Sequence, residues 1–383
     1  MPLAAIAGVG LTTQTRSFDG SSMEACLQAA SIALTDAGME ISEIDGIAAR
    51  WPGPGGTVFQ PGSTDWTAVF NRPFSWVYDT YPQGIPAVLD AGAAISAGLC
   101  KNVLIFGGQA GLTNNGSVAS YTRPENEFVA CWGSMTAAQF ALTAQVYLHR
   151  FKPNREKLAN LAATIRNAGS ANPEAVMAGR GPYTPEDILT SPPIAEPIRL
   201  LDLCLANEGA AAIIVTSTER ARDCPNSPIY VLGGGAEWYR QQYVNPPRFD
   251  EVWSLGTNSY HRTLATTDVK PSDIDLFEIY DINTFEIVRQ FELLKLCEIG
   301  EGVDYLDDAG IGLEGKHPTN TDGGLLSFSH IGWGAPTLKI VEATLQLRGI
   351  ARSGQVKGAE TAFVTGAGSG AQYHNSILLG KNE

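Results

Sequence analysis

The chain has 383 residues, of which 44% are hydrophobic and 17% charged, a composition typical of a globular protein with two or three core-bearing units. Its formal net charge of −14 argues against a surface for nucleic acid or anionic membranes. No apolar run reaches the length of about 18 residues that a membrane helix needs, and the first residues lack the basic segment of a signal peptide. We therefore expect a cytoplasmic protein without a membrane partner.

Cysteine and histidine spacing predicts no metal site. The six cysteines are scattered without a C-x-x-C pair, and the five histidines do not cluster at ligand spacing. Reduced thiols are expected in a cytoplasmic protein. No G-x-G-x-x-G motif opens a helix, so a dinucleotide site is not predicted either.

Strand and helix patterns alternate through the first half of the chain. The elements expected are a strand over 3–10, a helix over 21–38, an acidic turn and strand over 41–51, a loop over 52–75, an alanine-rich helix over 84–98 and a strand over 103–108. A strand over 210–216 completes this half.

The second half repeats the first. The acidic turn and strand over 271–280 match those over 40–49, and the pair Gly334 and Pro336 matches the pair Gly84 and Pro86 at the start of the alanine-rich helix. Such alternation predicts an α/β fold with mostly parallel sheets covered by helices. Two packed halves would also bring the starts of their equivalent helices together, where ligands of α/β folds gather.

An insertion separates the two halves. We assign residues 1–112 plus 196–226 to the N-terminal half, 113–195 to an inserted loop or lid domain, and 227–383 to the C-terminal half. An insertion of this size commonly builds a lid over a substrate or cofactor.

A glycine-rich stretch over 320–336 is the candidate functional centre. It places His330 just before an apolar helix that begins near Pro336 and ends at Gly349. The positive end of that helix favours negative charge developing nearby, and glycines allow a ligand to approach the backbone. A buried structural histidine in a glycine-rich turn explains this local pattern equally well.

Taken together, these motifs resemble the thiolase superfamily, in its sterol-carrier and lipid-transfer branch. The markers are the segments 203–215, 278–281, 291–297, 320–330 and 365–375, in that order, together with the duplication. The resemblance covers essentially the whole chain. It implies a thiolase-like fold: two duplicated βαβαβαββ halves in a layered αβαβα arrangement, with an inserted loop domain.

The departures from thiolases concern the nucleophile. A thiolase carries a reactive cysteine before its alanine-rich helix, where this chain has Tyr81, and a second cysteine where this chain has Thr365 and Gly366. The carbonyl-binding His-Asp of the sterol-carrier branch becomes Tyr280 and Asp281. Transfer of an acyl group through a thioester to the enzyme is therefore not expected.

The pattern is similar to the steroid side-chain aldolases of this superfamily, which lack the cysteine. The resemblance implies retro-aldol cleavage of a β-hydroxyacyl-CoA, with a 17-hydroxy steroid carrying a three-carbon CoA-thioester side chain giving a 17-ketosteroid and propionyl-CoA. It also implies a homodimer that binds two OB-fold partners of the DUF35 type as a heterotetramer. CoA would be part of the substrate, and no further cofactor is expected.

Site residues follow from these motifs. The expected catalytic residues are Tyr280, Asp281, His330, Tyr373 and His374, and the expected substrate-binding residues are Tyr81, Gly332, Trp333 and Gly368. His330 would hold the thioester oxygen or act as acid and base, and Tyr280 would form catalytic hydrogen bonds. Asp322 is expected to cap the turn at Gly323, or alternatively to orient His330. Tyr81 either fills the space of the missing cysteine or takes part in the chemistry.

Two other functions remain open from the sequence. The chain could be a non-catalytic thiolase-like subunit that scaffolds an acyltransferase or hydratase complex with an OB-fold partner. It could also be a Claisen-type enzyme that uses another nucleophile.

Overall fold

The computed structural model of the protein describes residues 2–50, 63–79, 84–111, 136–204, 206–239, 248–368 and 373–383. The N-terminal half contains β1 (Ala4–Leu11), α1 (Ser22–Ala37), β2 (Gly46–Arg50), α2 (Ser63–Val69), β3 (Trp76–Val77), α3 (Ile85–Ser96), β4 (Asn102–Gln109), β7 (Gly209–Thr216) and α9 (Thr218–Ala221). The inserted segment contains α6 (Thr136–Phe151), α7 (Arg155–Ala171), α8 (Pro185–Thr190) and β5 (Pro193–Ala195). The short strand β6 (Ile198–Arg199) follows it directly and pairs with β5.

The C-terminal half repeats the same kinds of element. It contains β8 (Ile229–Trp238), α10 (Phe249–Ser254), α11 (Thr257–Ala265), β9 (Leu276–Glu278), α12 (Thr284–Leu293), α13 (Gly302–Ala309), α14 (Ala335–Arg348), β10 (Thr361–Gly368) and β11 (Tyr373–Gly380). Short helical segments lie at Ile41–Glu43, Leu200–Asp202, Pro271–Asp273, Gly324–Phe328 and Gly332–Gly334.

The strands of both halves form one continuous sheet in the order β3-β2-β4-β7-β1-β8-β11-β10-β9. The halves join where Ala4, Ala5 and Ile6 of β1 pair with β8. In this sheet, β2 pairs in parallel with β3 and β4, and β9 with β10, while the other pairings are antiparallel. The expectation of mostly parallel sheets is therefore wrong. Strands as close along the chain as β10 and β11 have too short a connection for a parallel crossover.

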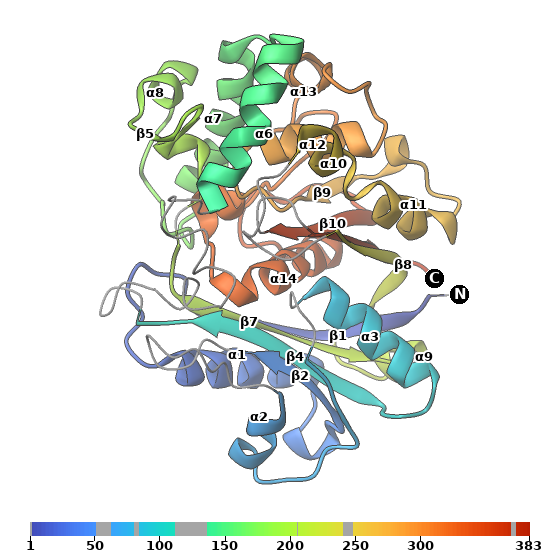
Figure 1. Ribbon diagram of the computed structural model, residues 1–383. Coiled ribbons are helices and arrows are strands. Elements are labelled where there is room, and N and C mark those ends of the chain that lie inside the picture. Colours follow the sequence, from blue (N-terminus) through green and yellow to red (C-terminus); the bar gives the residue numbers. More distant parts are fainter. Residues whose placement is uncertain are drawn as a thin grey trace.

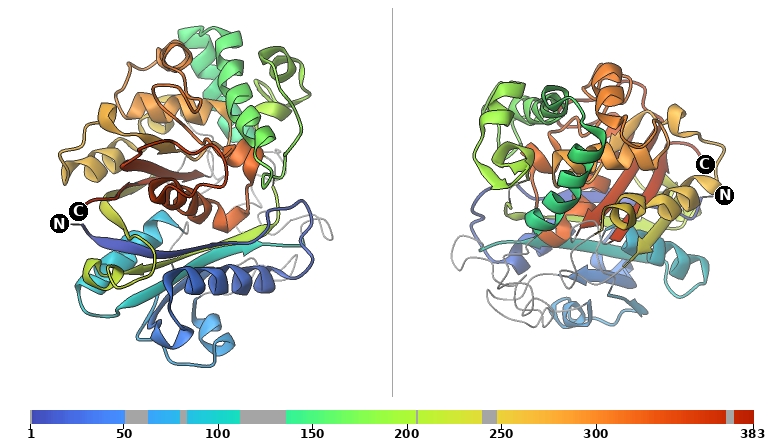
Figure 2. Two further views of the ribbon diagram at one scale, coloured as in Figure 1. Left: turned by 180° about the vertical axis from the view of Figure 1, so that it is seen from behind. Right: turned by 45° about the horizontal axis from the view of Figure 1, so that its top comes forward.

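Helices and sheet halves stack in five layers. In Figures 1 and 2, α1 covers one face of the N-terminal strands, α3 and α14 lie between the two sets of strands, and α11 covers the far face of β8 and β11. Apolar side chains from both sides fill the central layer, including Ile105, Ile340 and Val364. This arrangement confirms the predicted layered αβαβα fold.

The starts of the two equivalent helices meet, as the duplication predicted. Gly84, just before α3, has φ = 89°, and a Cβ built on it would lie 2.6 Å from the Cβ of Pro336 in the first turn of α14. Only a residue without a side chain fits this contact. Gly349 ends α14 with φ = 77°, so the predicted helix stop is also confirmed.

One element in the predicted loop is a helix. Residues 63–69 form α2, and its Trp66 is buried with its ring centroid 4.6 Å from that of Phe106. A helix this short shows almost no sequence period, and tertiary packing on a single aromatic side chain stabilises it.

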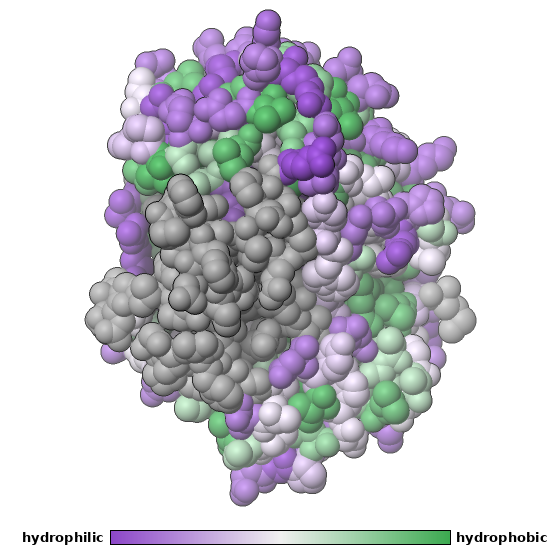
Figure 3. Space-filling view, in the orientation of Figure 1, coloured by the Kyte–Doolittle hydropathy of each residue, from purple (hydrophilic) through white to green (hydrophobic). Residues whose placement is uncertain are grey.

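The inserted segment packs on the C-terminal half. Tyr147 of α6 donates a hydrogen bond of 2.6 Å to Glu292 of α12, and Trp253 of α10 donates another of 2.6 Å to the same carboxylate. The outer surface over this segment and α13 is mainly hydrophilic, at the top of Figure 3. Within the described residues, no helix combines the length and apolar character required to span a membrane.

Candidate active site

Tyr280 and His330 come together from two neighbouring loops. Tyr280 lies two residues beyond β9, and His330 lies in the loop that leads into α14. Their side chains meet with the Tyr280 hydroxyl 3.2 Å from Nε2 of His330. Tyr280 is buried, whereas His330 is partly exposed, so the pair can be approached from the His330 side.

Hydrogen bonds fix the backbone on both sides of this pair. The N–H of Tyr280 donates to the Thr365 hydroxyl at 2.9 Å, and Nε2 of Gln290 donates to the Tyr280 carbonyl at 3.1 Å. The His330 carbonyl accepts a hydrogen bond of 2.9 Å from the N–H of Asn207. A phenol and an imidazole held in this way are preorganised for proton transfer.

The imidazole of His330 is neutral near pH 7. Burial lowers the pKa of His330 to about 4, and the nearby Asp281 carboxylate only partly opposes this shift. Its Nδ1 has no hydrogen-bond partner within the described residues. A neutral ring can accept a hydrogen bond from the Tyr280 hydroxyl through Nε2 and donate one to a ligand through Nδ1.

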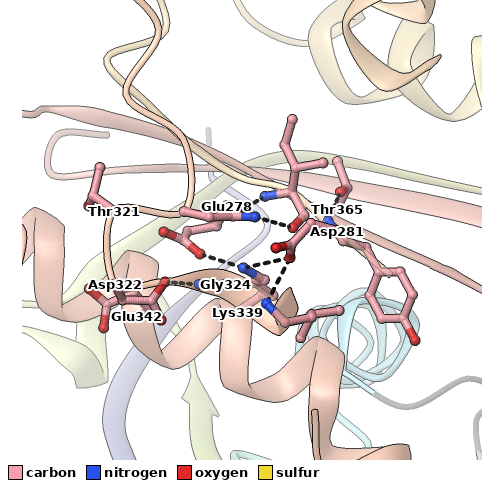
Figure 4. Close-up of polar contacts among 12 residues, drawn as sticks. Glu278, Asp281, Thr321, Asp322, Gly324, Lys339, Glu342 and Thr365 are labelled. Carbon is pink, nitrogen blue, oxygen red and sulfur yellow. Dashed lines mark hydrogen bonds and ion pairs between the residues drawn. The ribbon is translucent and has the colours of Figure 1, made fainter. Parts of the chain in front are cut away.

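Asp281 does not join the contact between Tyr280 and His330, although it directly follows Tyr280 in the chain. Its carboxylate accepts hydrogen bonds from the N–H groups of Leu325 and Leu326, at 2.9 and 3.3 Å, and lies 3.4 Å from Nζ of Lys339 (Figure 4). The structure therefore places Asp281 behind the Tyr280–His330 pair, at the start of the short helix Gly324–Phe328. Its predicted catalytic role would have to be indirect.

Asp322 caps the glycine turn, as predicted. Its Oδ1 accepts a hydrogen bond of 2.8 Å from the N–H of Gly324. The alternative, that Asp322 orients His330, has no support, because the carboxylate faces Gly324 and Lys339.

His374 is not brought to the Tyr280–His330 pair. It is fully buried in β11, and its Nε2 lies 3.3 Å from the hydroxyl of Tyr260 in α11. The ring centroids of these two residues are 5.0 Å apart. Side chains alternate along a strand, so the adjacent Tyr373 faces the opposite side of the sheet. Tyr373 is buried and pairs with Gly368 across the β10–β11 ladder.

The other predicted binding residues lie before α14 or outside the described residues. Gly332 has φ = 55°, and a Cβ on it would lie 2.2 Å from Oε1 of Gln109, so the loop packs tightly there. Trp333 is the middle residue of the turn Gly332–Gly334. Tyr81 falls outside the described residues.

Two buried polar residues near the helix starts were missed by sequence reasoning. Asn375 and Thr337 are fully buried, and neither the Asn375 amide nor the Thr337 hydroxyl has a hydrogen-bond partner in the described part of the chain. A Cβ on Gly366 would lie 2.4 Å from Oδ1 of Asn375 and 3.6 Å from Ile85, at the start of α3. Leaving such groups unpaired costs about 1–3 kcal/mol, so they are candidate ligand contacts. Strand alternation from Tyr373 could have indicated Asn375.

The described cysteines are poor nucleophiles. Burial raises the pKa of the Cys100 thiol to about 11 and that of Cys297 to about 12. It also raises the pKa of the other described thiols, those of Cys26, Cys204 and Cys224. In the part of the chain that the structure describes, no group of His, Cys, Asp and Glu side chains could hold a metal ion.

Sequence comparisons match known proteins over most of the chain. The family model described as Thiolase C-terminal domain-like matches residues 251–381. The chain is 30% identical over 400 residues to the 17-hydroxy-3-oxo-4-pregnene-20-carboxyl-CoA lyase of Mycobacterium tuberculosis, covering 98% of each protein. It is 29% identical over 353 residues to the steroid side-chain-cleaving aldolase of Thermomonospora curvata, covering 86% of each.

A solved structure also aligns with the chain over nearly its whole length. The Ltp2-ChsH2(DUF35) aldolase aligns with a TM-score of 0.83 and 26% identity over 99% of this chain and 98% of that one. The fold, the meeting helix starts and these matches agree with one another. The chain therefore belongs to the thiolase-like family that includes the steroid side-chain-cleaving aldolases.

Proposed function

We propose that this protein is a carbon–carbon lyase that cleaves a β-hydroxyacyl-CoA by a retro-aldol reaction. The substrate is a 17-hydroxy steroid with a three-carbon CoA-thioester side chain, and the products are a 17-ketosteroid and propionyl-CoA. The observation that carries the proposal is the Tyr280 hydroxyl held 3.2 Å from a neutral His330, in a fold whose described thiols are poor nucleophiles. The names of the relatives support the same chemistry.

The reaction needs one proton relay and no covalent enzyme intermediate. The Tyr280 oxygen accepts the proton of the β-hydroxyl as the Tyr280 proton passes to Nε2 of His330. The Cα–Cβ bond breaks, its electron pair forms the thioester enolate, and the hydroxyl carbon becomes the ketone. The same proton then returns through the pair to Cα, so nothing else is consumed. The negative charge of the enolate favours the imidazolium and offsets the low pKa of the free histidine.

Stabilisation of the enolate oxygen is the larger requirement. The meeting starts of α3 and α14 present the positive ends of two helices. The buried Asn375 amide and Ile85, the first residue of α3, both lie close to Gly366. Preorganised donors of this kind typically contribute a factor of about 10²–10³ in rate. We therefore assign the thioester oxygen to this region, with Asn375 as a donor.

We further propose that the enzyme works as a homodimer with two OB-fold partners of the DUF35 type. The similar Ltp2-ChsH2(DUF35) aldolase, whose name includes a DUF35 protein, supports such a partner. Co-expression with a DUF35 protein, followed by light scattering of the purified complex, should give the mass of a heterotetramer. A monomer that does not bind the partner would contradict this assembly.

The direct test is incubation with a β-hydroxyacyl-CoA that carries a tertiary alcohol, with the partner present. We expect equimolar ketone and propionyl-CoA, measured by liquid chromatography and mass spectrometry. No turnover in the presence of the partner would favour the scaffold function instead. An acyl group found on any thiol of the protein during turnover would contradict the mechanism.

A further inference from the structure

Lys339 is a buried cation whose partners lie directly behind the candidate active site. It belongs to α14 and is fully buried, with Nζ 3.1 Å from Oε2 of Glu278 and 3.4 Å from Oδ1 of Asp281. Figure 4 shows its side chain reaching from the helix toward these two carboxyl groups. Burying a lysine is costly unless it is paired, so this contact must be maintained in the folded protein.

Carboxyl groups outnumber the lysine in this cluster. Asp322 and Glu342 also face Lys339 closely enough to affect its charge, which makes four carboxyl groups around one ammonium group. Burial raises the pKa of Glu278 well above its usual range, raises that of Asp322, and raises that of Glu342 to about 8. Of these four carboxyl groups, those of Glu278 and Asp281 contact the Lys339 ammonium group directly.

Further charges surround the cluster. Arg352 lies near Glu342, and Arg166 lies near Asp281. The Asp281 carboxylate also acts on His330, because its negative charge opposes the lowering of the His330 pKa by burial. Asp281 thus interacts electrostatically with Lys339 on one side and with His330 of the candidate active site on the other.

Asp281 also connects Lys339 to the site mechanically. Its backbone follows Tyr280 directly, and its two carboxylate oxygens hold the N–H groups of Leu325 and Leu326 in the short helix that ends two residues before His330. A Cβ on Gly324 would lie 2.2 Å from Oδ2 of Asp281, so this contact leaves no room for displacement. One ion pair therefore constrains both loops that form the Tyr280–His330 pair.

We propose that Lys339 is a positioning residue for the cleavage reaction, acting through Asp281 on the Tyr280–His330 pair. The inference rests on the proposed function for its kinetic effect, but its structural effect can be measured separately. Without the cation, the Asp281 carboxylate loses the contact that holds it in place against the N–H groups of Leu325 and Leu326, so the two loops that carry Tyr280 and His330 are less firmly positioned.

The first test is Lys339→Met, which keeps the length of the side chain and removes its charge. We expect kcat to fall by at least about tenfold, with KM for the CoA thioester changed by less than about threefold, because the group acts on geometry at the reacting end. Lys157→Met is the matched control, since Lys157 pairs with Asp304 and Asp308 at the surface, and it should behave like the wild type.

A double-mutant cycle separates positioning from general destabilisation. If Lys339 acts by placing the Tyr280 hydroxyl, the losses in kcat of Lys339→Met and Tyr280→Phe should not add in the double variant. Fully additive losses, or a folded Lys339→Met that retains wild-type rates, would overturn the proposal.

A second variant tests the proposal if Lys339→Met folds poorly. A second measurement tests it if the protein does not catalyse the proposed reaction. Lys339→Met with Glu278→Gln changes both members of the Lys339–Glu278 contact, so neither is left buried beside a missing partner and folding should be restored. Asp281 still lacks its contact with Lys339, so the rate should remain low. Wild-type rates in this variant would contradict the role of Lys339. Independently of activity, the NMR signals of the His330 ring should shift in the Lys339 variants and stay unchanged in Lys157→Met. Unshifted signals would overturn the proposal even if the wild type cleaves no steroid.

Discussion

The C-terminal half contains two tyrosine–histidine pairs that look alike in isolation but differ in their surroundings. The Tyr280 hydroxyl lies 3.2 Å from Nε2 of His330, and the Tyr260 hydroxyl lies 3.3 Å from Nε2 of His374. Burial lowers the pKa of both histidines, and Nδ1 of each has no partner within the described residues. The pairs differ in position: the first lies in loops at the start of α14, and the second lies between β11 and α11.

The two pairs differ in their exposure. His330 is partly exposed, whereas His374 and its partner are enclosed, with the Tyr260 ring also packed edge-on against Phe363. The same phenol–imidazole contact can therefore serve chemistry where a ligand can reach it and packing where none can. We therefore expect substitutions in the Tyr280–His330 pair mainly to lower the reaction rate, and equivalent substitutions in the Tyr260–His374 pair mainly to lower stability.

The largest expected difference is in turnover. Tyr280→Phe should lower kcat by roughly 10²-fold or more, because the relay loses its proton-carrying oxygen, while the melting temperature changes little. Tyr260→Phe removes the same atom from the enclosed pair and should leave kcat nearly unchanged. Steady-state cleavage rates of both variants check this, and equal losses would remove the distinction between the pairs.

Truncation of the two histidines should affect stability in the reverse order, with the larger loss of folding free energy at the enclosed pair. His374→Ala should destabilise the protein by about 2–4 kcal/mol, since it leaves a cavity in the core and the Tyr260 hydroxyl keeps only its long contact of 3.4 Å with Gln290. His330→Ala should cost less stability but lower kcat by about 10²-fold. Urea unfolding measured beside kinetics would test both, and a stable, inactive His374→Ala would place His374 in the site after all.

The pH dependence of stability should identify the enclosed histidine. The pKa of His374 is lowered well below 6.5 on folding, so the unfolded chain binds its proton first as the pH falls. The wild type should therefore lose stability relative to His374→Asn between about pH 6.5 and 4.5, by up to about 1.4 kcal/mol per pH unit. Thermal melts of both proteins across this range provide the measurement. Parallel curves would show that His374 is not held neutral.

The smallest expected effect concerns the thiols. Because burial raises the pKa of every described cysteine, treatment with iodoacetamide should leave the cleavage rate within about twofold of the untreated enzyme. Inactivation that follows alkylation of one cysteine, located by peptide mapping, would mean that the chemistry does not rest on the Tyr280–His330 pair alone.

Much of the fold could be predicted because the duplication marks equivalent elements. The meeting of Gly84 and Pro336, and the position of His330 before α14, follow from local signals of glycine, proline and helical period. The face of His374 could not be predicted in the same way. Side chains alternate along a strand, so a shift of one residue in the strand register exchanges the two faces of β11.

The partners of Lys339 were also beyond sequence reasoning. A single lysine in an apolar helical run gives no indication that its partners lie some sixty residues earlier, in Glu278 and Asp281. The antiparallel pairing of β1 with β8 is similarly long-range, and only tertiary packing determines it.

The contact between Gly84 and Pro336 has a consequence for how such a catalyst can diverge. The two helix starts that meet here belong to the two copies of an internal duplication, so they hold equivalent positions in the two halves of the chain. The Tyr280–His330 pair lies in loops of the C-terminal copy alone, so the residues before α3 in the other copy can differ without altering this pair. Substitutions in the two copies can thus accumulate independently, while the close approach of Gly84 and Pro336 keeps the two helix starts together.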